Sequence, residues 1–516
     1  MKKITLIALA YFCIPAMAQD PYLNNTIINT SDIYGTSRFV AMGGAMGALG
    51  AEISIISSNP AGIGMIKKNE ASLTAGVSWM SNNSAKRMAS GTFGMFDQVG
   101  AITPFKSSSR LRNINFAFNY QKKADFNSCF FGETLSAASW ADQLFGLACD
   151  AYDNITSLYG KPENYYNTLY GLANKSNLFC ANIEKNSNDP NNTLGVSAGS
   201  LNAYEFNISM NLDDRYFFGI TFGLDNLDYY RLTDYWEQRT DSEGRVQDFG
   251  YINEQSVTGT GFNVKFGTTI RPIESKSFRI GLAVETPTWY NLQYTDNQSL
   301  STKYKLDNAI YDPTPHAYYT YYVSDLSDSN INYLNYQITT PWKLRIQAGS
   351  TISTNFAWGI EYEFANYPGV STRYPTLYGG TTIDEGFKDM TETMFNPQHT
   401  IRAGLEFKPL ASLSLRAGYN YITTITTSDS FWDPSLSDNS LAYPTGLDYM
   451  NLSDVHIATL GIGYRHKWFY ADMSYKYRHQ EGDYYAFDSY YSNIKMSPIP
   501  VDLSKHSITA TVGFRF

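Results

Sequence analysis

Residues 509–516 read TATVGFRF, and they alternate strictly between apolar side chains and small or polar ones. A period of two places the two sets on opposite faces of a β-strand. The same alternation recurs upstream, for example over 71–79, 114–120 and 401–407. The polar set of these segments is rich in Gly, Ser and Asn, whereas a water-facing sheet would carry mostly Lys, Glu and Thr. This composition suits strands whose inner face lines a lumen.

The composition narrows the class of protein. Of 516 residues, 17% are charged and 15% are aromatic, and the mean hydropathy is -0.31. A disordered chain would lack the aromatic residues, and a helical membrane protein would show several apolar runs of about 20 residues. A formal net charge of -9 argues against nucleic acid as a partner, because nucleic acid requires basic patches. Few charges, many tyrosines and no long apolar run indicate a transmembrane β-barrel.

Fourteen alternating segments predict an all-β membrane protein, a fourteen-stranded antiparallel barrel. Short and long connections alternate along the whole series, as periplasmic turns and surface loops do in outer-membrane barrels. This alternation predicts that both chain termini lie in the periplasm. The terminal Phe516 resembles the assembly signal of such barrels. The expected strands are 71–80, 97–105, 112–121, 202–212, 216–230, 255–271, 277–291, 336–350, 356–367, 399–408, 412–424, 455–465, 468–480 and 503–516.

Residues 1–18 are expected to be a cleaved secretory signal peptide. Lys2 and Lys3 form a basic start, residues 4–15 form a short apolar core, and Ala16-Met17-Ala18 fits an A-x-A cleavage site. The apolar core is too short to span a membrane with those flanks. An exported β-barrel belongs in the bacterial outer membrane.

Residues 19–70 precede the strands and lack their alternation. Small residues let backbone pack closely against backbone, so this segment is expected to form a compact hatch, or plug, inside the lumen. A dinucleotide-binding loop is excluded because no G-x-G-x-x-G follows a strand, and an acidic residue among the glycines excludes a transmembrane helix. The residues expected to build the hatch are Gly43, Gly44, Gly47, Asn59, Pro60 and Ala61.

The connection 122–201 is expected to be a long extracellular loop with short amphipathic helices. Loops of this length are usually functional or disordered. Its apolar faces either pack the loop onto the barrel rim or form an apolar groove at the cell surface. The candidate residues for ligand capture in such a groove are Trp140, Leu144, Phe145 and Leu147.

Three cysteines, Cys129, Cys149 and Cys180, lie in or beside this loop. In an oxidising compartment one disulfide could form and leave the third thiol free. Three unpaired cysteines acting as small apolar residues are an equal alternative. A zinc site is not expected, because no CxxC pair and no nearby His exist.

Predicted lumen positions carry both acids and bases. A buried charge must be paired, so ion pairs that rigidify the wall and hold the plug are a stronger hypothesis than catalytic carboxylates. The sequence also contains no HExxH or phosphate-loop motif. We therefore expect no enzyme activity, no cofactor and no metal. The charged lumen positions are Arg279, Glu285, Lys343, Arg345, Glu361, Glu363, Arg402, Glu406, Arg416, Asp472, Lys476 and Arg478.

Several motifs together resemble the FadL/TodX family of outer-membrane transporters for long-chain fatty acids and other hydrophobic compounds. The resemblance implies a fourteen-stranded barrel closed by an N-terminal hatch. It also implies ligand capture by surface loops, binding above the hatch and sideways exit through the wall. The motifs are the glycine-rich run leading to Asn59-Pro60-Ala61, followed by 258–263, 279–282, 341–345, 402–409 and 415–419.

Two functions remain open at this point. The first is transport of a small hydrophobic ligand, with the lipid bilayer and that ligand as partners. The second is a non-transport role as a subunit of an outer-membrane secretion or barrel-assembly complex, with other outer-membrane or periplasmic proteins as partners. A barrel fold alone does not decide between them. If transport holds, a wall interruption is expected in the second or third strand, where Pro104 removes one ladder donor.

Overall fold

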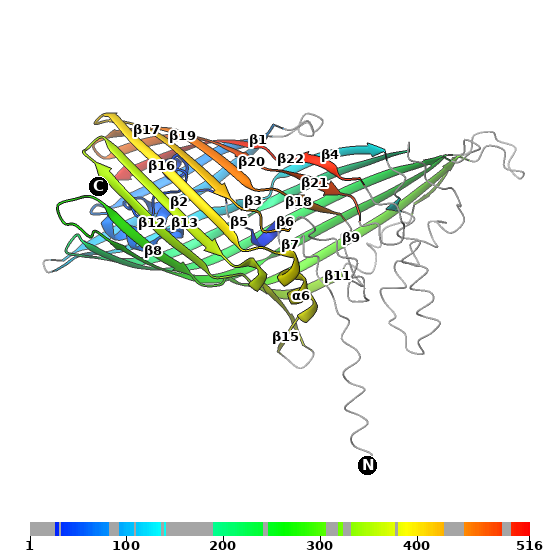
Figure 1. Ribbon diagram of the computed structural model, residues 1–516, viewed down its shortest axis with the longest axis horizontal. Helices are drawn as coiled ribbons and strands as arrows, with labels where there is room; N and C mark the ends of the chain where they lie inside the picture. The colour runs from blue at the N-terminus through cyan, green and yellow to red at the C-terminus, as the bar shows by residue number, and fades with distance from the viewer. Residues whose placement is uncertain are drawn as a thin grey trace, which may run out of the picture.

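The computed structural model is an elongated barrel of long, tilted strands (Figure 1). Among its described residues no helix is long and apolar enough to cross a membrane. The residues that the structure describes are 26–29, 32–81, 92–107, 110–135, 139–140, 189–240, 246–305, 318–322, 332–376, 380–427, 448–487 and 497–516.

The sheet closes into a fourteen-stranded antiparallel barrel, because the last strand pairs with the first over eleven residues. The fourteen expected strands are therefore confirmed. In order around the barrel they are β1 (Glu70–Met80), β2 (Thr92–Lys106), β3 (Leu111–Asp125), β5 (Pro190–Leu212), β6 (Tyr216–Thr240), β7 (Val246–Ile270), β8 (Arg279–Glu285) with β9 (Trp289–Lys305), β11 (Asn332–Thr339) with β12 (Lys343–Ile352), β13 (Phe356–Ala365) with β14 (Ser371–Pro375), β16 (Gln398–Leu410), β17 (Leu413–Ile422), β19 (Val455–His466), β20 (Phe469–His479) and β23 (Lys505–Arg515).

The two faces of the strands follow the expected register. Leu344, Ile346 and Leu405 are 39%, 50% and 50% exposed on the outer face, whereas Arg345 and Arg402 are buried in the lumen. A slip of one residue would exchange the two faces. The outer surface is therefore the apolar, lipid-facing surface of a membrane barrel.

The two ends of the barrel differ. Short connections gather at the end where the chain terminates (Figure 1), here called the short-turn end. At the other end, the long-loop end, β5, β6 and β7 run for 23 to 25 residues, beyond the roughly 9–11 needed to cross a bilayer. The further strands there are β4 (Ser128–Leu135), β10 (Tyr318–Tyr322), β15 (Thr381–Ile383) and the small sheet of β18 (Tyr449–Leu452), β21 (Glu481–Tyr485) and β22 (Ile499–Asp502).

Three adjacent strands of the wall are interrupted at one height. The breaks lie at 286–288 between β8 and β9, at 340–342 between β11 and β12, and at 366–370 between β13 and β14. Each break contains a proline, namely Pro287, Pro341 and Pro368. Because proline has no backbone N–H, each removes one ladder donor. We call these three breaks the proline row.

The wall interruption expected in the second or third strand does not occur at Pro104, because Pro104 pairs with Asn115 inside the β2–β3 ladder. That ladder does end at the pair Gln98–Gln121, although β2 begins at Thr92 and β3 continues to Asp125. The proline breaks lie in the seventh, eighth and ninth strands. Pro104 stands two residues from the end of β2, where a missing donor falls beside a turn. A proline at a strand end costs little, and it does not open a sheet.

The wall also splits above the proline row. The ladder between β13 and β16 ends at the pair Ala365–Gln398, and β14 then pairs with β15 instead of β16. Helix α6 (Glu385–Met394) and the 3-10 turn η5 (Tyr367–Gly369) fill the space between them, and Thr391 Oγ1 lies 3.4 Å from Val370 O. Asp384 caps α6 by accepting a hydrogen bond from Phe387 N.

Candidate functional site

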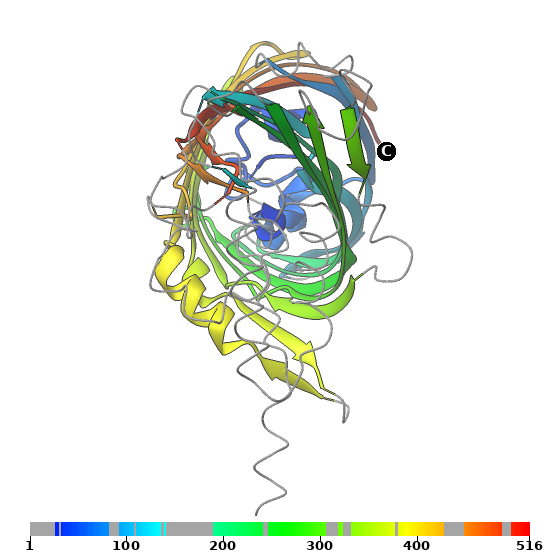
Figure 2. The ribbon, with the colours of Figure 1, turned by 90° about the vertical axis from the view of Figure 1, so that its right-hand side faces the viewer.

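The N-terminal segment, residues 32–66, lies inside the ring of strands (Figure 2). It contains α2 (Ser37–Ala41) and two 3-10 helices, η1 (Ile53–Ser57) and η2 (Pro60–Met65). The side chains of Ile53, Ile55 and Ile56 are fully buried in an apolar cluster of this segment. Wall residues such as Ile102, Ile422 and Ile457 belong to the same cluster, so the segment packs onto the inner wall through a shared apolar core.

The glycine-rich run of this segment packs against a row of glycines on the wall. Four glycines pair directly across β12, β13, β16 and β17, so the inner wall carries no side chain there. A Cβ at Gly404 would lie 2.2 Å from Met42 O, and one at Gly359 would lie 2.0 Å from Ala45 O. Only glycine permits this approach of backbone to backbone. The row consists of Gly349, Gly359, Gly404 and Gly418.

Two glycines on the segment adopt conformations that other residues avoid. Gly43 and Gly44 have φ of 61° and 74°, in the left-handed region. Gly47 has no such angle, but a Cβ there would lie 2.2 Å from Gln347 Nε2. All three glycines expected in the hatch therefore lie where the segment meets or turns along the wall.

Asn59 ties the second part of the segment to the wall. Its Oδ1 accepts from Ala61 N at 3.1 Å and so caps η2, which begins at Pro60. Its Nδ2 donates to Gln347 Oε1 at 2.7 Å and to Thr269 Oγ1 at 3.3 Å. One fully buried side chain thus fixes a helix start and joins it to two strands.

A layer of buried charges lies over the segment on its long-loop side. Arg345 donates to Glu363 at 2.6 Å and to Glu285 at 2.8 Å, and Arg402 donates to Glu361 at 2.7 Å and to Glu363 at 3.1 Å. The expected pairing of lumen charges is confirmed for these groups. We call this set the charge layer; its members are Lys123, Glu205, Asp225, Lys265, Glu285, Arg345, Glu361, Glu363 and Arg402.

An apolar cluster lies beyond the charge layer, toward the long-loop end. It joins side chains of several strands to the inner side of α6, whose Phe387 and Met394 are 1% and 4% exposed. Tyr290 links the two levels, because it belongs to this cluster and its hydroxyl donates to Asp225 at 2.7 Å. Members of this upper cluster include Phe126, Leu201, Leu227, Tyr229, Val257, Leu292, Tyr336, Ile338, Tyr367, Val370 and Ile425.

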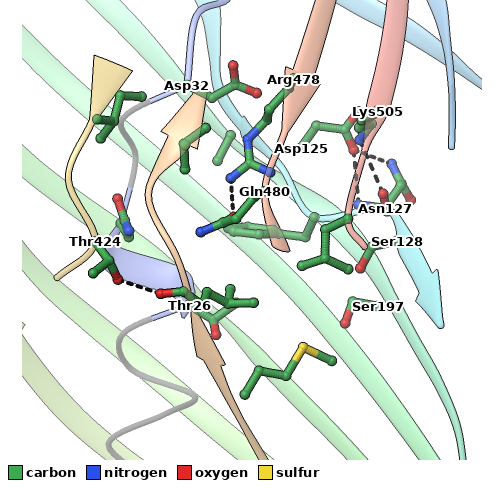
Figure 3. Close-up of a pocket in the computed structure, with 18 of the residues that line it drawn as sticks. Thr26, Asp32, Asp125, Asn127, Ser128, Ser197, Thr424, Arg478, Gln480 and Lys505 are labelled. Carbon is green, nitrogen blue, oxygen red and sulfur yellow. Dashed lines mark hydrogen bonds and ion pairs between the residues drawn. The ribbon is translucent and has the colours of Figure 1, made fainter. Parts of the chain in front are cut away.

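A cavity of about 210 Å³ lies beside the upper cluster (Figure 3). Asp32, Asp125, Arg478 and Lys505 form a charged side, on which Lys505 pairs with Asp125 at 3.1 Å. The remaining lining mixes apolar side chains with Arg231 and several polar residues, and it comes from the start of the described chain and from strands on both sides of the barrel closure. The apolar residues are Met80, Phe126, Phe130, Tyr229, Ile422, Ile425, Met450, Leu452, Val455 and Leu503.

Arg478 is the cation of this cavity that is least neutralised. It is half-buried, and its Nη2 donates to Gln480 Oε1 at 2.7 Å (Figure 3). Within the described residues no carboxylate lies at ion-pair distance from it, whereas Asp32 nearby pairs with Lys476 at 2.9 Å. The cavity thus combines an apolar lining with a guanidinium that has room for an anionic group.

The expected capture residues are only partly described. Trp140 is buried and stacks on Tyr251 with ring centroids 4.3 Å apart, so it packs against β7. Leu144, Phe145 and Leu147 lie outside the described residues, as do the expected signal peptide, Cys149 and Cys180. Cys129 is buried on β4, where its backbone N–H lies 3.3 Å from Met80 Sδ. In the described part of the chain, no three His, Cys, Asp or Glu are grouped as metal ligands.

Comparison with known proteins identifies the fold. No protein-family model and no curated protein matches the sequence. The structure is similar to the crystal structure of a Pseudomonas aeruginosa FadL homologue, with a TM-score of 0.53 and 11% identity, over 94% of this chain and 99% of that one. It is also similar to the P. putida toluene transporter TodX, with a TM-score of 0.50, 11% identity and the same two coverages. The fold is therefore that of the FadL/TodX barrels.

Proposed function

We propose that the chain moves small hydrophobic or amphiphilic molecules, of the fatty-acid type, across the bacterial outer membrane. The observation that carries the proposal is the cavity between the N-terminal segment and the long-loop end. Its apolar lining suits a hydrocarbon chain, and Arg478 suits a carboxylate. The FadL homologue and the toluene transporter TodX, which share the fold, support the same class of ligand by analogy.

The N-terminal segment acts as the plug in this proposal, with the C-terminus in the periplasm. The described chain starts at the other side of the segment, where Ile27 and Ile28 belong to the upper cluster. The segment contacts strands around the ring. Ser37 N–H donates to Thr511 Oγ1 on β23, Thr459 Oγ1 on β19 donates to Ala41 O, and Asn115 Nδ2 on β3 donates to Ile63 O. A ligand in the cavity therefore meets a closed floor on the periplasmic side.

The ligand leaves sideways, because the direct path down is unfavourable. Below the upper cluster an apolar molecule would meet the charge layer, and each CH₂ moved from an apolar to a polar setting costs about 0.8 kcal/mol. The wall beside the upper cluster is weakened by the proline row and split between β14 and β16, with α6 as the cover. Displacing α6 would join the upper cluster to the bilayer without breaking a strand ladder.

Filling the cavity tests the binding step. Ser197 lines the cavity on β5, opposite Ser128 on β4 (Figure 3). Ser197→Trp is expected to lower uptake of a radiolabelled long-chain fatty acid at least tenfold in cells that lack other transporters. The matched control is Ser275→Trp, an exposed position in the turn between β7 and β8 at the short-turn end, which should transport normally. Normal uptake by Ser197→Trp would contradict the proposal and favour the role as a complex subunit.

Locking α6 tests the exit step separately. Val370 and Thr391 are buried in contact across the split wall. In a variant with Cys129, Cys149 and Cys180 replaced by serine, Val370→Cys with Thr391→Cys should form a disulfide. We expect oxidation to stop release of fluorescent fatty acid into proteoliposome membranes and reduction to restore it. Equal release in both states, with the disulfide verified by mass, would place the exit elsewhere.

A further inference from the structure

The short-turn end of the barrel is strongly basic, although the chain as a whole carries a net charge of -9. Its turns and adjoining strand ends hold twelve Lys and Arg against four Asp and Glu. We call this surface the basic rim. Its cations are Lys67, Lys68, Lys106, Arg110, Arg112, Arg215, Arg271, Lys276, Lys408, Arg465, Lys467 and Arg515, and its acids are Glu70, Asp213, Asp214 and Glu274.

Each of the four acids forms an ion pair with a cation of the rim. Asp214 pairs with Lys67, Asp213 with Arg110 and Glu274 with Arg215, at 3.0, 3.0 and 3.3 Å. Glu70 pairs with Arg515 at 2.5 Å. Within the described residues no acid lies at ion-pair distance from the exposed cations Lys68, Lys106, Arg112, Lys276, Arg465 and Lys467.

The cations without an acid partner stand beside the aromatic residues that mark the edge of the apolar belt. Lys106 follows Phe105, which is 57% exposed, and Lys467 precedes Trp468, which is 58% exposed. Arg112 lies on the outward face of β3, four residues before the exposed Phe116. Aromatic side chains at such a girdle sit at the level of the lipid headgroups. These cations are therefore at the height of the lipid phosphates.

We propose that the basic rim binds the phosphate groups of anionic phospholipids in the leaflet at the short-turn end. The cations occupy the hairpins β2–β3, β7–β8 and β19–β20, so they are spread around the barrel. A ring of charge at headgroup height matches a shell of lipids, whereas an acidic protein would need a single patch. Each phosphate contact should raise the affinity about fivefold.

Native mass spectrometry tests this preference directly. The folded barrel is extracted with an equimolar mixture of phosphatidylglycerol and phosphatidylethanolamine, and the ratio of the two bound lipids is measured. The wild type should be enriched in phosphatidylglycerol. The triple variant Lys106→Gln, Lys276→Gln and Lys467→Gln should lower that ratio at least fivefold. Heat-modifiable gel mobility verifies that each variant is folded.

A second triple variant separates contact from overall charge. Lys67→Gln, Arg110→Gln and Arg215→Gln remove the same number of positive charges, but these three cations are engaged by Asp214, Asp213 and Glu274. We expect this variant to retain most of the enrichment. Equal losses in the two triple variants, or a wild type without preference for phosphatidylglycerol, would overturn the proposal. The second result would leave an acidic protein as the partner to seek.

Discussion

A barrel that lacks residues 41–62 is expected to conduct ions, whereas the full-length protein stays closed in planar bilayers. The missing stretch holds the glycine-rich run, η1 and Asn59, and these residues fill the lumen between strands on both sides. Fourteen strands enclose more space than the eight whose interior side chains fill completely, so an emptied lumen should hold water. The measurement is single-channel conductance of the deletion variant, in which a Gly-Ser linker joins Val40 to Ile63.

A point variant keeps this prediction testable if the deletion fails to fold. Gly404→Val would place a Cβ 2.2 Å from Met42 O, so the segment can no longer lie flat on the wall. Brief channel openings are the expected result. Gly94→Val is the matched control, because no atom lies within 4 Å of a Cβ added there. If the deletion variant conducts no ions, or if the two glycine variants show the same conductance, the segment does not close the pore.

The faces of the barrel could be predicted because the alternation of side chains is a local property. Arg402 and Leu405 lie three residues apart on β16, and their chemistry alone assigns one to the lumen and the other to lipid. The hatch glycines were likewise visible as a run of small residues. The wall glycines that these residues contact could not be predicted, because the pairing of Gly359 with Gly404 depends on the strand register.

The weak part of the wall could not be predicted for the same reason. Pro287, Pro341 and Pro368 are far apart in sequence, and only the sheet brings them to one height. Pro104, the proline expected to weaken the wall, lies near a strand end and does not break its ladder. Helix α6 was missed because ten residues with Phe387 and Met394 on one face are a weak signal inside a long connection.

The cavity lining is also a product of the closed barrel. Ser197 and Arg478 lie on β5 and β20, far apart in sequence. Arg478 did appear among the expected lumen charges, but its sequence neighbours do not distinguish it from the paired Lys476. Only the contacts of each cation separate the group that holds the wall together from the group that faces the cavity.

Replacing Arg345 by Met should destabilise the folded barrel by about 3–5 kcal/mol, as loss of one partner from a buried ion pair does. Arg345 lies on β12 between β8 and β13, and its guanidinium bonds to Glu285 and Glu363 at once. Both carboxylates would stay in the lumen with fewer donors. The measurement is the free energy of unfolding in urea from lipid vesicles. Arg215→Met removes an exposed pair with Glu274 and should cost only about 0–1 kcal/mol.

Neutralising Glu285 and Glu363 in the Arg345→Met variant should restore some stability and change the path of the ligand. Arg345→Met combined with Glu285→Gln and Glu363→Gln replaces three charges by groups of similar size. Part of the lost stability should return, because neither carboxylate is left charged without Arg345, although the buried Lys343 loses the two acids that face it. With the charge layer thinned, fatty acid should then reach the upper face of the plug, where photolabelled ligand would attach to residues of the N-terminal segment. Equal stability of the single and triple variants would mean that water already screens these charges. In that case the charge layer would neither hold the wall nor direct an apolar ligand sideways.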